Sequence, residues 1–231
     1  MTDTDAHHRT IRSFVRREGR ITRSQQRALE ELLPVFGLSS EGHIDPVAVF
    51  GRSAPLTLEI GFGNGDSLAT MAEQDTASDF IGIEVHRPGV GHLLLELERR
   101  ETGNVRVMCD DAVPLIGRCL PDHSLDRVLL FFPDPWHKKK HNKRRLIQSP
   151  FVALLVSRLK PGGTLHLATD WEDYARQMMD VLSAEPGLAN EFGEGAFAPR
   201  PDHRPLTKFE LRGERLGHGV WDLVFRQRSP A

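Results

Sequence analysis

The sequence has few cysteines, no long apolar run and no large excess of either charge. Its 231 residues include two cysteines, Cys109 and Cys119, which are too few for a disulfide framework or a zinc ribbon and lie among apolar neighbours, as buried thiols do. No apolar stretch approaches the length of a membrane span, and the N-terminal sequence MTDTDAHHRTIR contains no hydrophobic signal core. We therefore expect a protein of the reducing cytoplasm with no membrane partner.

The charge is nearly balanced overall but is unevenly distributed. A net charge of -2 argues against a protein whose whole surface binds polyanions. Six of the nine residues from His137 to Arg145 are nevertheless Lys or Arg, and seven arginines fall between Arg9 and Arg27. The sequence therefore predicts local basic regions, which leaves a nucleic-acid partner open.

Strand-like and helix-like segments alternate along most of the chain. Apolar runs predict strands over 56–61, 80–85, 105–109, 125–132 and 163–168. Amphipathic patterns predict a helix after each strand, at 65–74, around Pro88, up to Leu120, and over 143–159 and 171–183. Segments 206–212 and 220–226 resemble two strands of a hairpin. This order predicts an α/β fold with a doubly wound, mostly parallel sheet and an antiparallel hairpin at one edge.

The N-terminal region differs from the rest of the chain. Residues 1–27 are polar and Arg-rich, which predicts a partly flexible arm that orders fully only on a partner. The pattern SQQRALEELLP predicts a short helix that is capped by Ser24 and ends before Pro34. Residues 28–231 are then expected to form a single domain, because the chain is short for two independent cores.

The first predicted strand leads into a glycine-rich turn that also carries an acid. The turn reads Glu59-Ile-Gly-Phe-Gly-Asn-Gly65, and its glycines, Gly61, Gly63 and Gly65, allow a sharp turn and a close approach to a ligand. In the dinucleotide motif G-x-G-x-x-G the third glycine comes one place later. A carboxylate at Glu59 would also repel a pyrophosphate, whereas it could pair with a cationic aminoacyl group. The pattern therefore favours S-adenosylmethionine over a nicotinamide dinucleotide.

The second and third predicted strands also end in acids, where ligands bind in such sheets. Glu84 could accept hydrogen bonds from both ribose hydroxyls, and Asp110 or Asp111 could accept one from an adenine amino group. Each acid has a structural alternative, Glu84 as a surface acid and either aspartate as the N-cap of the following helix. Acids at three successive strand ends nevertheless predict a Rossmann-like class I methyltransferase.

An acid, an aromatic residue and a basic run follow the fourth predicted strand in the sequence FFPDPWHKKKHNKRR. Asp134 could accept from a base edge, Trp136 could stack on a base, and the run from Lys138 to Arg145 could contact phosphates. Core packing is the alternative for Trp136, and a solvated charged loop is the alternative for the basic run.

Six segments match a known family. They are IRSFVRREGRIT, LEIGFGNG, IGIEVHRPGVG, FFPDPWHKKKHNKRR, ATDWEDYA and RPLTKFELRGERLGHGVWDLVF, and they cover most of the chain from Ile11 to Phe225. On these segments the chain resembles the bacterial tRNA (guanine-N7)-methyltransferases. The resemblance implies transfer of a methyl group from S-adenosylmethionine to N7 of a variable-loop guanosine, position 46, of tRNA.

The resemblance also implies roles for individual residues. Asp134 is implied to be catalytic. Cofactor contacts are implied at Glu59, Gly61, Gly63, Gly65, Glu84, Asp111 and Asp134. Substrate contacts are implied at Lys138, Asp170, Thr207, Lys208, Phe209 and Glu210. RNA contacts are implied at Lys140, His141, Asn142, Lys143, Arg144 and Arg145. The residues themselves leave Asp110 as an alternative to Asp111 and a helix N-cap as an alternative role for Asp170.

Four other interpretations of the sequence are open. Amino-methyltransferases carry D/N-P-P-aromatic, but here a second proline after Asp134 is missing. A non-catalytic RNA-binding protein could retain the fold, and a nicotinamide oxidoreductase would need the other glycine spacing. His137 and His141 are four residues apart, but no third ligand lies nearby in the sequence, so we expect no metal. The oligomeric state, monomer or homodimer, stays open.

Overall fold

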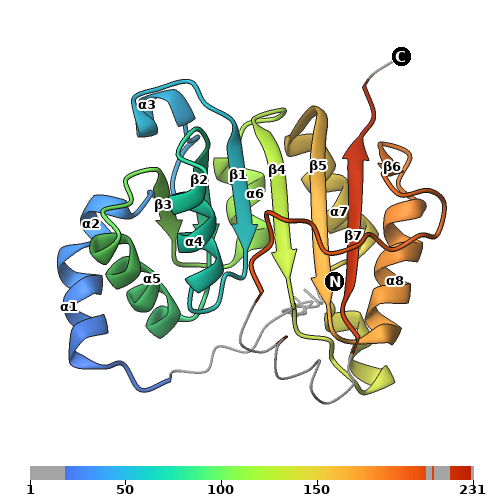
Figure 1. Cartoon of the computed structure of the whole chain (residues 1–231), viewed down its shortest axis with the longest axis horizontal. Coiled ribbons are helices and arrows are strands. Elements are labelled where there is room, and N and C mark those ends of the chain that lie inside the picture. Colours follow the sequence, from blue (N-terminus) through green and yellow to red (C-terminus); the bar gives the residue numbers. More distant parts are fainter. Residues whose placement is uncertain (1–18, 207–209, 211–218, 230–231) are drawn as a thin grey trace, which may run out of the picture.

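The computed structural model describes residues 19–206, 210 and 219–229. Its seven-stranded sheet has the order β3-β2-β1-β4-β5-β7-β6 (Figure 1). The strands are β1 Leu56–Ile60, β2 Asp79–Ile83, β3 Val105–Met108, β4 Leu125–Phe131, β5 Leu159–Thr169, β6 Leu188–Asn190 and β7 Trp221–Gln227. The first five are mutually parallel, and β7 is antiparallel to both β5 and β6. This confirms the predicted doubly wound sheet with an antiparallel edge.

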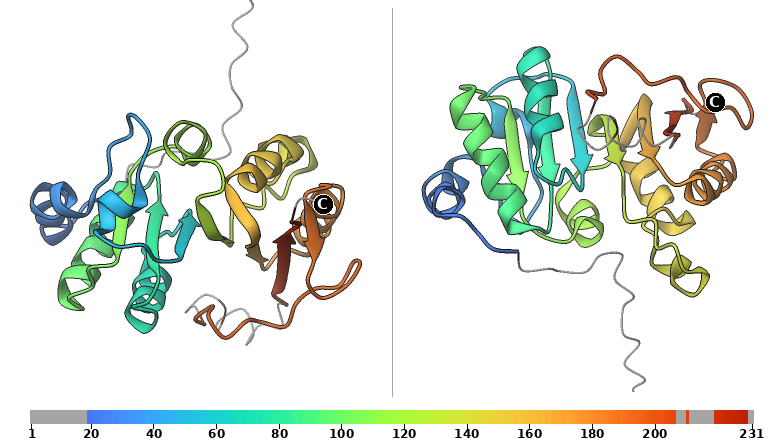
Figure 2. Two further views of the ribbon diagram at one scale, coloured as in Figure 1. Left: turned by 90° about the horizontal axis from the view of Figure 1, so that it is seen from above. Right: turned by 60° about the horizontal axis from the view of Figure 1, so that its bottom comes forward.

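Helices cover both faces of the sheet. They are α1 Arg23–Glu31, α2 Leu33–Phe36, α3 Pro46–Phe50, α4 Asp66–Gln74, α5 Arg87–Arg99, α6 Ala112–Cys119, α7 Ser149–Arg158 and α8 Glu172–Ser183, with a 3-10 helix, η1, over Lys139–Arg144. Figure 2 shows α4 and α5 on one face and α6 and α7 on the other. None of the helices in the described part of the chain is long and apolar enough to cross a membrane.

Two hydrophobic clusters correspond to these two faces. One joins the sheet to α6, α7 and α8, and the other joins it to α1, α4 and α5. Strands β1 and β2 are buried along their whole length, because helices cover both of their sides. The parallel strands all end at the lower edge in Figure 1, so the residues that follow them are brought together there.

Two helix starts differ from the sequence prediction. The helix predicted over 143–159 is divided into η1 and α7, and Pro150 lies in the first turn of α7. Proline has no N–H to donate and its ring clashes with the preceding turn, so a helix can begin at Pro150 but not run through it. The cap of α1 is Thr22 and not Ser24, because Thr22 and Gln25 form a reciprocal capping box. Pro34 lies in the first turn of α2.

The antiparallel edge is built from other residues than predicted. Strand β7 was expected to pair with 206–212, but its partners are β5 and β6. Of the range 206–212, Leu206 and Glu210 are described and neither is in a strand, while the rest lies outside the described residues. Most of the predicted N-terminal arm also lies outside them, and its residues 23–27 belong to α1, which packs on α5.

Candidate active site

Two pockets adjoin at the carboxyl ends of the parallel strands. Pocket A has a volume of about 680 Å³ and contains the ends of β2, β3 and β4. Pocket B has a volume of about 860 Å³ and contains the glycine-rich turn together with residues that follow β5. Gly61, Phe131 and Phe132 line both pockets. Each volume is within the usual range for a small-molecule site, and together they could hold a cofactor and a substrate base side by side.

The glycine-rich turn connects β1 to α4 in a conformation that favours glycine. Gly61, Gly63 and Gly65 have φ angles of 72°, 59° and 79°. A Cβ atom at Gly65 would lie 2.7 Å from the Cβ of Leu93 in α5, so this position combines a left-handed backbone with close helix packing. The predicted glycine pattern therefore has a physical basis at all three positions.

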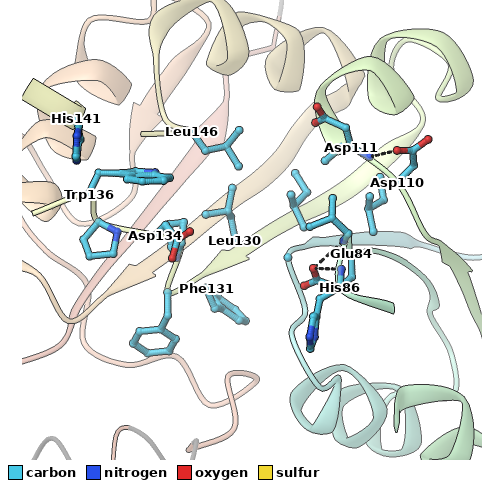
Figure 3. A pocket seen from close by; sticks show the side chains of 18 of the residues that line it. Glu84, His86, Asp110, Asp111, Leu130, Phe131, Asp134, Trp136, His141 and Leu146 are labelled. Carbon is cyan, nitrogen blue, oxygen red and sulfur yellow. Dashed lines mark hydrogen bonds between the residues drawn. The ribbon is translucent and has the colours of Figure 1, made fainter. Parts of the chain in front are cut away.

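Glu84 is buried at the end of β2, with 8% of its surface exposed. One carboxylate oxygen accepts from the Gly63 N–H at 2.9 Å, and the other accepts from the Val85 and His86 N–H groups at 2.7 and 2.9 Å (Figure 3). The surface-acid alternative is therefore wrong. A carboxylate has about four acceptor positions, so one position remains for a ligand hydroxyl.

The two aspartates after β3 both line pocket A. Asp111 caps α6 by accepting from the Val113 N–H at 3.2 Å, which confirms the N-cap role for this residue. Asp110 accepts from the Asp111 N–H at 2.8 Å. Figure 3 places both carboxylates on the side of the pocket opposite Asp134 and Trp136. The choice between them as the acceptor for adenine stays a prediction.

Glu59 is a buried acid below the glycine-rich turn and lines pocket B. Its side chain is 3% exposed, and its Oε2 atom has no hydrogen-bond partner among the described residues. Burial, with a smaller effect of the Glu84 charge, raises the pKa of Glu59 to about 8. A cationic group in the pocket would supply the missing donor and stabilise the ionised carboxylate. Glu59 therefore fits the aminoacyl end of S-adenosylmethionine.

Asp134 extends into pocket A from a constrained loop after β4. The loop begins and ends with non-glycine residues in the left-handed region, Phe132 at φ 52° and Trp136 at φ 47°. Such a conformation costs of order 1–3 kcal/mol per residue and persists only where the surroundings enforce it. Pro133 and Pro135 restrict the backbone on either side of Asp134. The predicted catalytic residue is thus exposed on a loop with little conformational freedom.

The basic run after this loop divides into outward and inward side chains. Lys138, Lys140 and Lys143 are exposed, as phosphate contacts require, and Arg144 lies over the Trp136 ring at 4.4 Å. His141 packs edge-on against the same ring at 6.0 Å. Trp136 therefore contacts two side chains of the run and also lines pocket A. Asn142 is half-buried beside them.

Arg145 departs from the predicted RNA-binding role. It is 3% exposed, and its guanidinium donates to the carbonyl of Pro135, to Gln177 and to Asp173. A side chain committed to these protein contacts is not available for a phosphate. The sequence could not separate Arg145 from its neighbours, because a basic run does not show which member points inward.

The substrate residues predicted beyond β5 lie partly in pocket B. Asp170 follows β5, is exposed and lines this pocket. Glu210 also lines the pocket but is buried. Asp170 is not the cap of α8, because that position belongs to Trp171. The remaining predicted substrate residues, Thr207, Lys208 and Phe209, lie outside the described residues. Lys138 is exposed at the rim of pocket A.

A buried ionic network at pocket B was not found from the sequence. Arg204 is 1% exposed and donates to both oxygens of Asp222, at 2.7 and 2.9 Å, and to Glu210 at 2.6 Å. His166 pairs with Asp222 at 2.7 Å. Burial acts to raise the pKa of Asp222, but its bonds to His166 and Arg204 outweigh this and lower it. No spacing signal in the sequence links Asp222 to its partners, because Arg204 is 18 residues away and His166 is 56 residues away.

The two histidines of the basic run do not converge on one point. His137 packs edge-on against Trp171 at 4.2 Å, while His141 packs against Trp136. Within residues 19–206, 210 and 219–229, no group of three His, Cys, Asp or Glu side chains could hold a metal ion.

The chain matches a methyltransferase family and several named bacterial proteins. A family model described as "Putative methyltransferase" matches residues 53–223. The tRNA (guanine-N(7)-)-methyltransferase of Methylococcus capsulatus is 60% identical over 230 residues, which are 98% of this chain and 100% of that protein. The protein of the same name from Alcanivorax borkumensis is 59% identical over 96% of this chain and 93% of its own length.

Solved structures share the fold at low sequence identity. The 16S rRNA methyltransferase KamB has a TM-score of 0.59 at 12% identity, covering 82% of this chain and 96% of its own. An rRNA methylase from Streptococcus thermophilus has a TM-score of 0.51 at 13% identity, covering 80% and 93%. These likenesses show the class I methyltransferase fold that the sequence predicted. The family model and the matches over nearly the whole length of named relatives show that the chain belongs to the bacterial tRNA (guanine-N7)-methyltransferase family.

Proposed function

We propose that the protein transfers a methyl group from S-adenosylmethionine to N7 of the guanosine at position 46 in the variable loop of tRNA. The observation that carries this proposal is the identity of 60% to a tRNA (guanine-N(7)-)-methyltransferase over 98% of the chain. The adjoining pockets, with the strand-end acids around them, supply the matching chemistry. A tRNA substrate would also place the enzyme in the cytoplasm, as the sequence predicts.

The described residues fit S-adenosylmethionine along its length. Glu59 would face the ammonium group, and the glycine-rich turn would pass close to the aminoacyl chain. Glu84 would accept from one ribose hydroxyl through its remaining acceptor position, and not from both as the sequence predicted. Asp110 or Asp111 would accept from the adenine amino group. When bound, the cofactor supplies an electrophilic methyl group on a sulfonium centre.

The substrate atom determines what the protein must do. Guanine N7 carries a lone pair and no proton, so its attack on the methyl carbon needs no general base. The protein must instead align the reacting atoms, and such positioning can supply about 7–11 kcal/mol of a barrier. The constrained loop of Pro133 to Pro135 and the walls of pocket B provide fixed surfaces for this purpose.

Asp134 has the properties of a transition-state stabiliser. Methylation at N7 makes the purine cationic, so its N1–H and exocyclic amine become stronger donors. A carboxylate that accepts from them binds the transition state more tightly than the ground state. Asp134 is exposed in pocket A, close to the residues shared with pocket B. Asp170 offers a further acceptor from the other side of the crevice, in pocket B.

The exposed lysines after the loop would hold the RNA. Lys138, Lys140 and Lys143 all lie on η1 or beside it, next to the mouth of pocket A. Their charges would contact tRNA phosphates, which set affinity and orientation but not sequence. The base itself would be selected by the acceptors in the two pockets.

Methyl transfer mapped to a single base tests the proposed function. Purified protein is incubated with labelled S-adenosylmethionine and unmodified tRNA, and the product is cleaved with borohydride and aniline, which are selective for N7-methylguanosine. We expect label in tRNA and cleavage at position 46. Binding of tRNA without any methyl transfer would instead identify a non-catalytic RNA-binding protein that retains the fold.

A further inference from the structure

Arg145 connects the loop that carries Asp134 to helix α8. Its Nε donates to the carbonyl of Pro135 at 2.8 Å, within the constrained loop. Its two terminal nitrogens donate to Gln177 at 2.6 Å and to Asp173 at 2.5 Å. Both of these partners are on α8. A single guanidinium therefore holds together two segments that are separate in the chain.

The surroundings of Arg145 fix its orientation. The guanidinium stacks on the ring of Tyr174 at 4.8 Å, and the Tyr174 hydroxyl in turn accepts from the Ile147 N–H at 3.1 Å. Arg145 is 3% exposed, so water does not compete for its donors. A planar guanidinium can donate in these three directions at once and stack on a ring, whereas a lysine ammonium cannot reproduce that geometry.

The two connected segments carry or adjoin acids of the predicted site, the catalytic Asp134 and the substrate-binding Asp170. Asp134 is adjacent to Pro135, whose carbonyl Arg145 holds, and Asp170 lies between β5 and the start of α8. The loop of Asp134 stores strain at Phe132 and Trp136, so it needs external contacts to keep its conformation. Arg145 is one of several such contacts: the Phe132 N–H donates to the Ala168 carbonyl at 2.8 Å at the start of the loop, and Arg144 and His141 pack on Trp136 at its end.

We propose that Arg145 is a positioning residue for methyl transfer, which fixes the loop of Asp134 against α8 and does not contact RNA. The inference rests on the proposed function. Loss of Arg145 should affect the catalytic step, because a displacement of about 1 Å in a reacting group can lower a rate by about 100-fold. Affinity for tRNA should depend instead on the exposed members of the basic run.

Substitutions of Arg145 separate positioning from RNA contact. Arg145→Lys keeps the charge but loses the planar arrangement of donors that a guanidinium provides. We therefore expect kcat to fall about 10- to 100-fold while the binding of S-adenosylhomocysteine is unchanged. Arg145→Gln removes the charge, yet the salt dependence of tRNA binding should match the wild type. Lys143→Gln is the contrasting variant, because loss of an exposed phosphate contact should reduce that salt slope by about 0.7–0.9.

Substitutions in α8 test the same link from the other side. Asp173→Ala removes one acceptor of Arg145 and should lower kcat about threefold to tenfold. Glu172→Ala is the matched control, because Glu172 is also an acid in the first turn of α8 but pairs with Arg176. The double variant Arg145→Lys with Asp173→Ala should show less than the product of the two single losses.

Hydrogen exchange of residues 131–138 without RNA gives a readout that does not depend on activity. Arg145→Lys should increase exchange there, and thermal unfolding would show whether the fold is retained. Wild-type kcat in Arg145→Lys, a salt slope reduced in Arg145→Gln as in Lys143→Gln, or equal effects of Asp173→Ala and Glu172→Ala would each overturn the proposal. If the wild type does not methylate tRNA, the proposed function fails, whereas the exchange comparison still decides the role of Arg145.

Discussion

Glu84 accepts a hydrogen bond from the Gly63 N–H at 2.9 Å, so a residue of pocket A fixes the glycine-rich turn of pocket B. Both carboxylate oxygens of Glu84 are acceptors for backbone N–H groups. An acid at this position therefore shapes the turn before any ligand contact is made. The same group would then serve the ribose of the cofactor.

Glu84→Gln should weaken both cofactor binding and the fold. In glutamine an NH₂ group replaces one of the two carboxylate oxygens, and each of these oxygens accepts from a backbone N–H in the wild type. At least one buried backbone N–H therefore loses its acceptor. We expect a loss of about 1–3 kcal/mol in the free energy of unfolding. Affinity for S-adenosylhomocysteine should fall by at least about tenfold. Urea unfolding and calorimetry measure these effects, and Glu73→Gln at an exposed site is the control.

Glu59 should make cofactor binding depend on pH. Its pKa is raised to about 8 by burial and by Glu84, so it binds a proton in the folded protein that it has lost in the unfolded chain. The protonated Glu59 therefore contributes to the stability of the fold. This contribution is fully present below the unfolded pKa of about 4.5 and is lost as pH rises to about 8. A ligand ammonium beside Glu59 would favour ionisation and release the proton. Affinity for S-adenosylhomocysteine should therefore increase as pH rises towards about 8.

Calorimetry in buffers of different ionisation enthalpy detects this proton release. In Glu59→Gln the release should disappear, and the affinity should change little across the same pH range. Unchanged proton release in this variant would show that another group titrates and that Glu59 does not face the ammonium.

Arg204 should contribute strongly to stability because it neutralises two buried carboxylates. Arg204→Ala leaves Asp222 and Glu210 without their shared cation, and such a loss typically costs about 3–5 kcal/mol. Arg226→Ala is the matched control, since Arg226 is 53% exposed and a surface ion pair contributes about 0–1 kcal/mol. Urea unfolding of the two variants compares them. Equal effects would contradict the interpretation of a buried network.

The exposed lysines should control tRNA affinity and its salt dependence. Lys140→Gln with Lys143→Gln removes two charges, so the slope of log Kd against log salt should fall by about 1.4–1.8. Binding of S-adenosylhomocysteine should stay at the wild-type value. Lys160→Gln, at the opposite end of the sheet where Lys160 pairs with Asp126, should leave the slope unchanged. A slope unchanged in the double variant would place the RNA elsewhere.

The sequence predicted the sheet and the acids at its strand ends because both are local signals. Each strand is a short apolar run, and each acid lies at or just after the end of one, so a parallel sheet brings Glu59, Glu84 and Asp111 to the same edge. The start of the helix predicted over 143–159 was wrong, because the ring of Pro150 sets the start of α7, whereas the rest of the helix is confirmed by α7.

The roles of Arg145 and Arg204 could not be predicted because they depend on contacts between distant segments. Arg145 has the same sequence surroundings as Lys143, and only the approach of α8 turns one of them inward. Arg204 is paired with Asp222, which lies 18 residues later on β7. Burial of a charge leaves no pattern in the sequence when its partners are far apart in the chain.

The single-turnover rate of Asp134→Asn, with saturating S-adenosylmethionine and tRNA, tests the proposed mechanism most directly. Asparagine keeps the size of Asp134 but loses the charge that would stabilise the methylated purine. We predict a rate about 100- to 1,000-fold below the wild type, with tRNA affinity within about twofold. A wild-type rate of N7 methylation in this variant would contradict the account.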